Sequence, residues 1–302
     1  MNNQKFLVVI LGPTAIGKTA LAIEVAKGLN TEIVSADSRQ FFREISIGTA
    51  KPTGEELKAA RHHFINSHSI AEDYNVGKFE EDAIALIEKV LDKKNSVVMV
   101  GGSGLYIDAV CKGFDKLPKA DLKIRKQLTE LYSAKGITAL QKLLKEKDEE
   151  HCKKIDLSNP HRLMRALEVC LITGKPYSAL RKGKKQKRHF SSIKIGLNMD
   201  REELYARINQ RVDDMMKCGL LEEVKSVVEH KEKNALRTVG YKELFGYLEE
   251  KTDLQTAVEK IKQNTRNFAK RQLTWFRRDK EIKWFSPNEK EKMMAHIRAE
   301  MN

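Results

Sequence analysis

Residues 12–19, Gly-Pro-Thr-Ala-Ile-Gly-Lys-Thr, have the residue types and the spacing of a phosphate-binding loop. The segment fits the pattern GxxxxGK[ST], in which glycines let backbone N–H groups converge on phosphate oxygens. Lys18 can neutralise phosphate charge, and the hydroxyl of Thr19 can ligate Mg²⁺. We predict that the whole loop binds a diphosphate or the phosphates of a nucleotide such as ATP: Gly12, Pro13, Thr14, Ala15, Ile16, Gly17, Lys18 and Thr19.

A second candidate for chemistry is Asp37, in the sequence Ala-Asp-Ser-Arg-Gln at 36–40. Three interpretations of its carboxylate are open. It can bind Mg²⁺, it can act as a general base at the mouth of the loop, or it can cap the N-terminus of a helix. Triphosphatases usually carry an aspartate after a hydrophobic strand, where it organises Mg²⁺. The apolar run at 97–100 leads instead into Gly-Gly-Ser-Gly at 101–104, without such an aspartate. The loop therefore does not decide which phosphate-bearing ligand is bound.

The elements around these residues predict an α/β fold. Residues 6–11 and 97–100 are continuous apolar runs, typical of buried parallel strands, and a shorter strand is expected at 32–36. Apolar residues recur at helical spacing directly after the loop and again at 79–92. Because strands alternate with helices, we predict a P-loop NTPase-like parallel sheet core that binds ligands at the carboxyl ends of its strands.

The rest of the chain is predicted to be mostly helical. From 121 to about 180 the periodicity is helical without a convincing strand, and a strand is expected to return at 191–199. We therefore predict an α/β core with a helical C-terminal part and an inserted all-helical domain. The expected bounds are 1–115 and 191–302 for the core and 116–190 for the insertion.

Positive charge is abundant and clustered. The chain has 56 Lys and Arg against 42 Asp and Glu, a formal net charge of +14. The run 181–189 holds six Lys and Arg and no acid, and 260–280 holds eight against the single acid Asp279. Such clusters favour a nucleic-acid partner. We interpret 181–189 as a mobile phosphate-binding loop, and we expect Arg266, Lys270 and Arg277 to share the polar face of a helix.

Several kinds of site and location are not expected. The four cysteines stand alone, without a CxxC pair, so neither a zinc site nor a disulfide framework is predicted. No stretch approaches the roughly 18 apolar residues of a membrane helix. The apolar run near the N-terminus leads into the glycine loop rather than into a cleavage site, so no targeting segment is expected and the cytoplasm is favoured.

Taken together, the motifs resemble the tRNA dimethylallyltransferase family, also called tRNA isopentenyltransferases. After the loop come ADSRQ (36–40), GTAKP (48–52), GGSGLY (101–106), NPHRLMRALEV (159–169), TGKP (173–176), RTVGYKE (237–243) and RNFAKRQLTWFRRD (266–279), in the order of that family. The resemblance covers about residues 6–285. No cysteine-bearing zinc finger follows, so the chain is similar to the bacterial form.

The resemblance implies a reaction and its chemistry. A dimethylallyl group would pass from dimethylallyl diphosphate to N6 of the adenosine 3′-adjacent to the anticodon, in tRNAs that read codons beginning with U. Mg²⁺ would accompany the diphosphate. Asp37 would be the base on the adenine N6 amine, and Ser103 would be catalytic, at a place where the family usually has threonine. Arg211 matches an arginine that binds the diphosphate; without the resemblance, a surface charge on a helix is the favoured interpretation.

The resemblance also implies contacts with tRNA. The matching positions are Asp37, Ser38, Arg39, Gln40, Ser103, Arg125, His161, Arg162, Leu163, Met164, Arg165, Arg237, Thr238, Val239, Gly240, Tyr241 and Lys242. Gly240 would permit close backbone approach, and Tyr241 would offer a face on which a base can stack. We expect a monomer, because tRNA itself provides a large partner surface.

Two other functions fit part of the sequence. A small-molecule kinase would explain the loop and Asp37, with 181–189 as an arginine-bearing lid, but not the basic helices. A non-enzymatic RNA-binding P-loop protein would explain the charge. It predicts that Asp37→Ala changes no measurable activity.

Overall fold

The computed structural model describes residues 4–115, 117–181, 183 and 186–302. The chain forms two compact units: one combines 1–111 with 188–302, and the other comprises 112–187. The inserted segment therefore begins and ends somewhat earlier than the bounds 116 and 190 expected from the sequence.

The larger unit is built on a six-stranded sheet in the order β3-β2-β4-β1-β5-β6, in which every neighbouring pair is parallel. Its strands are β1 (Phe6–Leu11), β2 (Ile33–Ser35), β3 (His62–His63), β4 (Ser96–Gly101), β5 (Ser191–Leu197) and β6 (Lys283–Phe285). The two central strands β1 and β4 are buried along their whole length, as their continuous apolar runs predict. The predicted parallel α/β core is confirmed.

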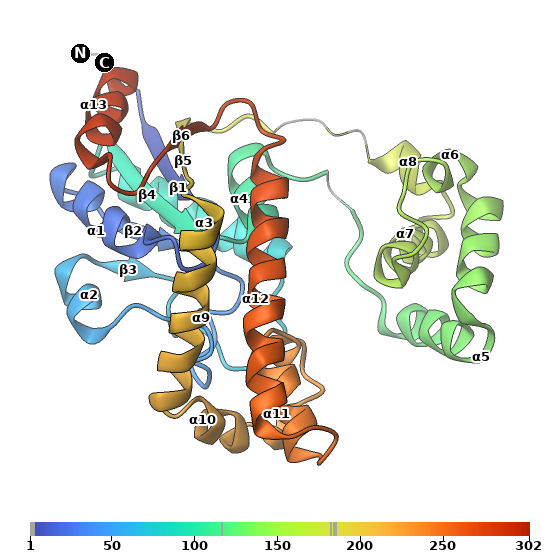
Figure 1. The fold of residues 1–302 in the computed structure, drawn as a ribbon. Helices are drawn as coiled ribbons and strands as arrows, with labels where there is room; N and C mark the ends of the chain where they lie inside the picture. Colours follow the sequence, from blue (N-terminus) through green and yellow to red (C-terminus); the bar gives the residue numbers. More distant parts are fainter. Residues whose placement is uncertain (1–3, 116, 182, 184–185) are drawn as a thin grey trace. The chain divides into compact units, whose positions relative to one another are not determined.

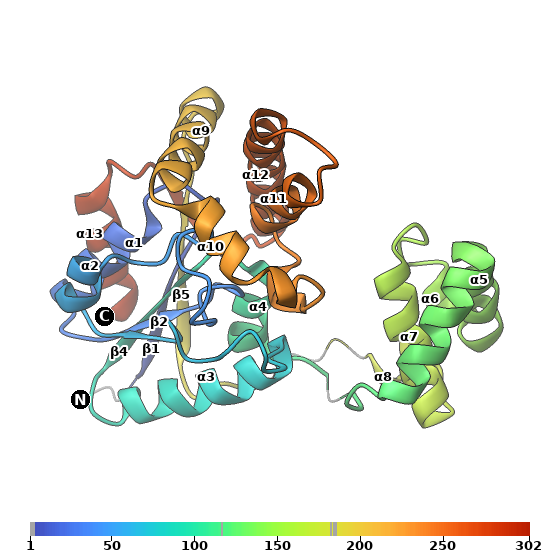
Figure 2. The ribbon, with the colours of Figure 1, turned by 90° about the horizontal axis from the view of Figure 1, so that it is seen from below.

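Helices cover both faces of this sheet (Figures 1 and 2). The helices of this unit are α1 (Lys18–Gly28), α2 (Gly54–Ala59), α3 (Val76–Leu91), α4 (Gly104–Lys112), α9 (Arg201–Lys217), α10 (Leu220–Ser226), α11 (Tyr241–Leu248), α12 (Leu254–Phe276) and α13 (Lys290–Met301), with 3₁₀ turns η1 (Val228–His230) and η2 (Asn234–Leu236). Alternate residues of β1 enter different cores, because strand side chains point to opposite faces. Leu7, Val9 and Leu11 pack with α3, whereas Phe6, Val8 and Ile10 pack with α1 and α13.

The smaller unit is helical. It contains α5 (Leu122–Lys147), α6 (Glu149–Cys152), α7 (Pro160–Thr173) and α8 (Tyr177–Leu180), and no strand occurs in the part of this unit that the structure describes. Its core is formed mainly by leucines of α5 and α7. Asn159 caps α7 by accepting from the N–H of Arg162, and Gly174 ends the helix at φ 66°, so the predicted stop at Gly174 is confirmed.

Three loops that carry candidate residues begin at one edge of the sheet. β1, β2 and β4 are parallel neighbours, and their carboxyl ends lead into 12–19, 36–40 and 101–104. Gly101 is needed there, because a Cβ atom at this position would lie 2.4 Å from the carbonyl oxygen of Ala36. The fold thus brings together loops that are far apart in the sequence.

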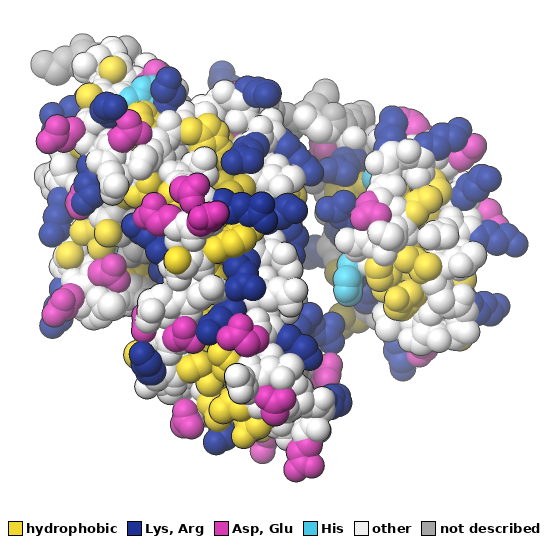
Figure 3. Space-filling model, in the orientation of Figure 1, with side chains coloured by type: hydrophobic (Ala, Val, Ile, Leu, Met, Phe, Trp, Pro, Cys, Tyr) yellow, Lys and Arg dark blue, Asp and Glu magenta, His cyan; other side chains and the backbone are white. Residues whose placement is uncertain are grey.

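Positive side chains are spread over the surface, including the part of α12 visible in Figure 3. Of the expected polar face, Lys270 and Arg277 are exposed, whereas Arg266 donates to Oδ1 of Asn209 at 2.6 Å. The interpretation of 181–189 as a phosphate-binding loop lies partly outside the described residues, at 182, 184 and 185. Within that run, Arg188 is bound at 2.6 Å to Glu80 and donates to two carbonyls of α4, so it holds structure rather than phosphate.

No helix in the described ranges combines the length and the apolar character that crossing a membrane requires.

Candidate active site

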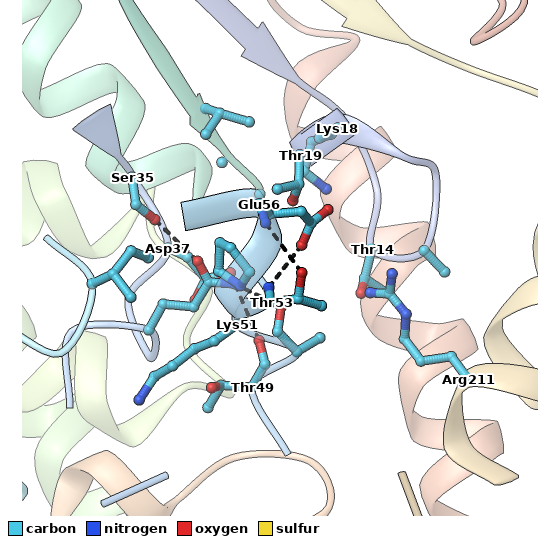
Figure 4. A pocket seen from close by; sticks show the side chains of 18 of the residues that line it. Thr14, Lys18, Thr19, Ser35, Asp37, Thr49, Lys51, Thr53, Glu56 and Arg211 are labelled. Carbon is cyan, nitrogen blue, oxygen red and sulfur yellow. Dashed lines mark hydrogen bonds between the residues drawn. The ribbon is translucent and has the colours of Figure 1, made fainter. Parts of the chain in front are cut away.

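A pocket of about 700 Å³ in the larger unit lies where the three loops meet (Figure 4). Its walls include the phosphate loop from Thr14 onward, Asp37 and Gln40, the segment 49–53, and Gly101 with Gly102. Arg211 reaches the same pocket from α9. The structure therefore brings most of the predicted donor-side residues together with Asp37.

The phosphate loop leaves the N-terminus of α1 open toward the pocket. The helix begins at Lys18, and its cap residue is Gly17 at φ 94°, which has no side chain to occupy the first N–H groups. Ala15 is also left-handed, at φ 65°, so the loop turns tightly around the space that it encloses. Free N–H groups and the positive end of the helix dipole make this an anion site.

Two cations add to that site. The Nζ atom of Lys18 donates to the carbonyl of Pro13 at 2.7 Å, and burial lowers the pKa of Lys18 from 10.5 to about 8. Asp37 opposes this shift, and the charge of Arg211 adds to it. Burial also lowers the pKa of Arg211. Arg211 is therefore not an ordinary solvent-exposed arginine on the surface of α9. Two partly buried cations close enough to repel each other favour an anionic ligand between them.

The depressed pKa of Lys18 predicts that diphosphate binding weakens as the pH rises. A bound anion raises the pKa of Lys18, so binding takes up a proton above the free-state pKa of about 8. After correction for the ionisation of pyrophosphate itself, the affinity for inorganic pyrophosphate should be flat below pH 7.5 and should fall by up to about tenfold per pH unit above 8. Calorimetric titration from pH 7 to 9 measures this fall.

Lys18→Arg is the matched control for this pH dependence, because a guanidinium keeps its charge over the range. The ionisation of pyrophosphate itself affects both proteins equally. Parallel curves for the two proteins would show that Lys18 does not carry the dependence.

Asp37 lies in a turn rather than at the start of a helix. Its Oδ1 atom accepts from the N–H of Arg39 at 2.9 Å, and residues 38–41 form a turn. Among the described residues, none donates to Oδ2. The interpretation as a helix N-cap is wrong, because no helix follows. The interpretations as a general base and as a Mg²⁺ ligand both remain.

Hydrogen bonds hold the turn at 36–40 on several sides. Ser103 Oγ accepts from the N–H of Ser38 at 3.1 Å and donates to its hydroxyl at 3.2 Å. The guanidinium of Arg39 donates to the carbonyl of Asn234 at 2.7 Å. Gln40 bonds both the end of β2, through Ser35, and the carbonyls of Thr49 and Ala50. Ser103 itself does not line the pocket, so its contact with Ser38 positions the turn.

Gln272 is a site residue that the sequence analysis missed. Its side chain, 6% exposed, accepts from the N–H of Thr14 at 2.9 Å and donates to the carbonyl of Gly102 at 2.9 Å. It therefore ties the phosphate loop to the loop at 101–104. A signal was available, because Gln272 lies on the apolar stripe of α12 between Ala269 and Phe276, where a polar side chain needs a partner.

Other missed residues line the pocket between β2 and α2. Lys51 donates to the carbonyl of Phe42, to Ser46 Oγ and to Asn66 Oδ1, and burial lowers the pKa of Lys51 to about 8. Glu56 accepts from the N–H of Thr53 at 2.8 Å in a capping box that starts α2. Lys51 belongs to the motif GTAKP (48–52). This motif contributed to the resemblance to the family, but no role was predicted for its lysine.

The segment 237–242 departs from one expectation. Tyr241 is fully buried, and its hydroxyl donates to Oε1 of Glu223 at 2.6 Å. Its ring lies against Gly48, where an added Cβ would be 2.6 Å away. The expectation that Tyr241 offers a stacking face is therefore wrong, because the ring is enclosed by protein. Arg237 and Lys242 in the same segment are exposed.

In the helical unit, two of the predicted RNA-binding arginines share a buried carboxylate. Glu168 is fully buried and accepts from Nη2 of Arg125 at 2.7 Å and from Nη1 of Arg165 at 2.8 Å. Each arginine keeps about a third of its side chain exposed, 34% for Arg125 and 33% for Arg165. The ion pairs orient both guanidinium groups while part of each stays at the surface.

Of the remaining predicted residues of this unit, His161 and Arg162 are exposed near the start of α7. The side chains of Leu163 and Met164 are buried in the helical core. That these two positions contact tRNA stays a prediction. Consecutive residues of a helix point in different directions. A continuous stretch such as 161–165 therefore contains core residues as well as residues that can contact a partner.

Comparison with known proteins gives a consistent result over nearly the whole chain. The family model described as IPP transferase matches residues 40–279. A tRNA dimethylallyltransferase of Christiangramia forsetii is 54% identical over 298 residues, covering 98% of this chain and 99% of that protein. The tRNA dimethylallyltransferase 1 of Bacteroides fragilis is 45% identical over 295 residues, covering 98% of each.

Solved structures agree with the fold. The tRNA isopentenylpyrophosphate transferase of Bacillus halodurans is 34% identical, with a TM-score of 0.74 over 99% of this chain and 97% of that one. A eukaryotic dimethylallyltransferase acting on tRNA is 26% identical, with a TM-score of 0.79 over 98% of this chain and 78% of that one. From this family match and the full-length relatives, the chain belongs to the IPP transferase family.

Proposed function

We propose that this protein is a tRNA dimethylallyltransferase, which transfers a dimethylallyl group from dimethylallyl diphosphate to N6 of an adenosine in tRNA. One observation carries the proposal: a single pocket is lined by an anion site, with Lys18 and Arg211, and by the carboxylate of Asp37. Transfer from a diphosphate to an amine needs both, a place for the leaving group and an acceptor for the proton. The naming of the full-length relatives supports the same reaction.

The donor half of the site stabilises the leaving group. When the bond between C1 of the dimethylallyl group and the diphosphate oxygen breaks, negative charge grows on the diphosphate. Lys18, Arg211 and the residues at the N-terminus of α1 line the pocket in which that charge would develop, and preorganised donors lower the barrier most where charge develops. We propose that the loop holds the diphosphate of a prenyl donor rather than the phosphates of ATP.

The acceptor half is Asp37. The N6 amine of adenine forms the new bond to C1, and the nitrogen becomes positively charged as it does so. Oδ2 of Asp37, to which none of the described residues donates, accepts the N6 proton, which leaves neutral N6-dimethylallyladenosine and free diphosphate. Ser103 and Gln40 keep the turn that carries Asp37 in place.

The donor set of the pocket fits a Mg²⁺ ion shared with the substrate. Mg²⁺ prefers oxygen ligands and is commonly held by one or two carboxylates together with substrate phosphates. Thr19 and Asp37 line the pocket, and no group of three or more His, Cys, Asp or Glu side chains in the described ranges could hold a metal alone. When bound, the ion would neutralise diphosphate charge. We propose that Thr19 supplies its protein ligand.

We further propose the finer identity of the acceptor from the resemblance of the motifs. The target is the adenosine 3′-adjacent to the anticodon in tRNAs that read codons beginning with U. The formal charge of +14 and the exposed cations of α12 support a polyanionic partner. A monomer that acts in the cytoplasm completes the proposal, since one tRNA supplies a large partner surface.

Incubation with dimethylallyl diphosphate, Mg²⁺ and undermodified tRNA, followed by mass analysis of the nucleosides, tests the proposal. We expect adenosine to gain one C5H8 unit, and a tRNA with guanosine at the target position to gain none. Absence of the product with the matched tRNA would overturn the proposal. ATP-dependent phosphorylation of a small acceptor would favour the kinase instead.

A further inference from the structure

We propose that Glu223 is a positioning residue for the acceptor side of the reaction. It acts by holding the turn at 46–50 against the segment that carries Asp37. The inference rests on the proposed function, because it concerns the alignment of the adenine amine. Glu223 lies on α10 and does not line the pocket, so it acts through other residues.

The carboxylate of Glu223 accepts hydrogen bonds from three successive backbone N–H groups. Oε2 accepts from Ser46 at 2.6 Å and from Ile47 at 2.8 Å, and Oε1 accepts from Gly48 at 2.9 Å. Successive N–H groups in a turn form a concavity that binds anions. Here the anion is a side chain of the protein, contributed by a residue far away in the sequence.

The turn held in this way forms part of the pocket and supports Gln40. Ser46, Ile47, Thr49 and Ala50 line the pocket. The carbonyls of Thr49 and Ala50 accept from Nε2 of Gln40 at 3.2 Å and 3.1 Å, and Oε1 of Gln40 accepts from Ser35. Gln40 belongs to the same turn as Asp37, so Glu223 is linked to the segment of the proposed base through the backbone of 46–50 and its hydrogen bonds on both sides.

The backbone of this turn needs outside support. Ala50 has φ 48°, a left-handed conformation that a residue with a Cβ adopts at an energetic cost. Such conformations persist where surrounding contacts determine them. Glu223 and Gln40 supply hydrogen bonds on the two sides of the turn.

Tyr241 connects the same carboxylate to a segment expected to contact tRNA. Its hydroxyl donates to Oε1 of Glu223 at 2.6 Å, and burial raises the pKa of Tyr241, so the hydroxyl stays a donor. Four donors thus converge on one side chain. A carboxylate can accept from all of them, whereas a carboxamide has one acceptor oxygen and turns its own N–H groups toward the others. A carboxylate is therefore required at position 223 to accept all four hydrogen bonds, and a carboxamide of the same shape cannot replace it.

Glu223→Gln tests the inference, with Glu222→Gln as the matched control. Glu222 is the neighbouring exposed residue, and its ion pair is with Lys225 at 3.9 Å. For Glu223→Gln we expect a loss of about ten- to a hundredfold in the single-turnover rate of prenyl transfer, the scale of an acceptor misplaced by about 1 Å. Affinity for inorganic pyrophosphate should stay unchanged, and amide hydrogen exchange at 46–48 should speed up. The control should change none of these.

Two results would overturn the inference: faster amide exchange at 46–48 without any loss of transfer rate, or parallel losses in pyrophosphate affinity and rate, which would mean general loosening. If Glu223→Gln does not fold, Tyr241→Phe removes one of the four bonds and keeps the buried ring, and it should show a smaller loss with the same pattern. A wild-type protein that transfers no prenyl group would overturn the proposed function, and amide exchange would then still decide whether Glu223 holds the turn.

Discussion

Asp37→Asn is expected to slow prenyl transfer by about 10²- to 10⁴-fold, the usual contribution of a positioned general base. The asparagine keeps an Oδ1 atom, so it can still accept from the N–H of Arg39 and preserve the turn. It loses the negative oxygen that takes the N6 proton. The rate constant of a single turnover, with both substrates saturating, measures the chemical step directly.

Binding measurements separate the role of Asp37 in catalysis from a role in recognition. Affinities of Asp37→Asn and Asp37→Ala for tRNA and for pyrophosphate should stay near those of the unaltered protein. A loss of tRNA affinity in proportion to the loss of rate would make Asp37 a recognition residue. Unchanged turnover would instead show that Asp37 is not the general base.

The sequence was sufficient for features that depend on local pattern. The apolar runs at 6–11 and 97–100 predicted the two central strands, because a strand buried on both faces needs no alternation. The glycine-lysine motif predicted the phosphate loop. The edge strands β3 and β6 were missed, since two or three residues are too short for a periodicity to be seen.

Residues whose role depends on distant partners could not be identified in this way. Gln272 lies 258 positions from Thr14, and Glu223 lies 177 positions from Ser46, yet each pair is hydrogen-bonded. For Tyr241, in contrast, a role was predicted from the sequence and is wrong. Its match to a tRNA-contact segment of the family suggested base stacking, but the fold placed the ring against Gly48 in the core. The residue type shows which contacts a side chain is able to make. Whether the side chain is accessible for those contacts depends on how it packs in the fold.

Lys18→Met is expected to weaken the binding of pyrophosphate, which Asp37→Asn leaves unchanged, and to slow prenyl transfer as well. Removing the ammonium deletes a charged hydrogen-bond donor from the diphosphate site, and such bonds contribute about 1.5–3 kcal/mol, or about ten- to a hundredfold in affinity for pyrophosphate. The transfer rate should fall by a further factor, about 10²–10³ if Lys18 stabilises the leaving group as a preorganised donor does. Affinity for tRNA should change little, because the contact is with the donor.

Lys27→Met is the matched control for Lys18→Met, since Lys27 is an exposed lysine in the last turn of the same helix. It removes the same charge without touching the pocket. Equal loss in both variants would attribute the effect to net charge, and retained pyrophosphate affinity in Lys18→Met would show that the loop does not hold the diphosphate. If Lys18→Met loses donor affinity and Asp37→Asn loses only the chemical step, the pocket is divided as proposed: the leaving group at the N-terminus of α1, and the proton acceptor at the end of β2.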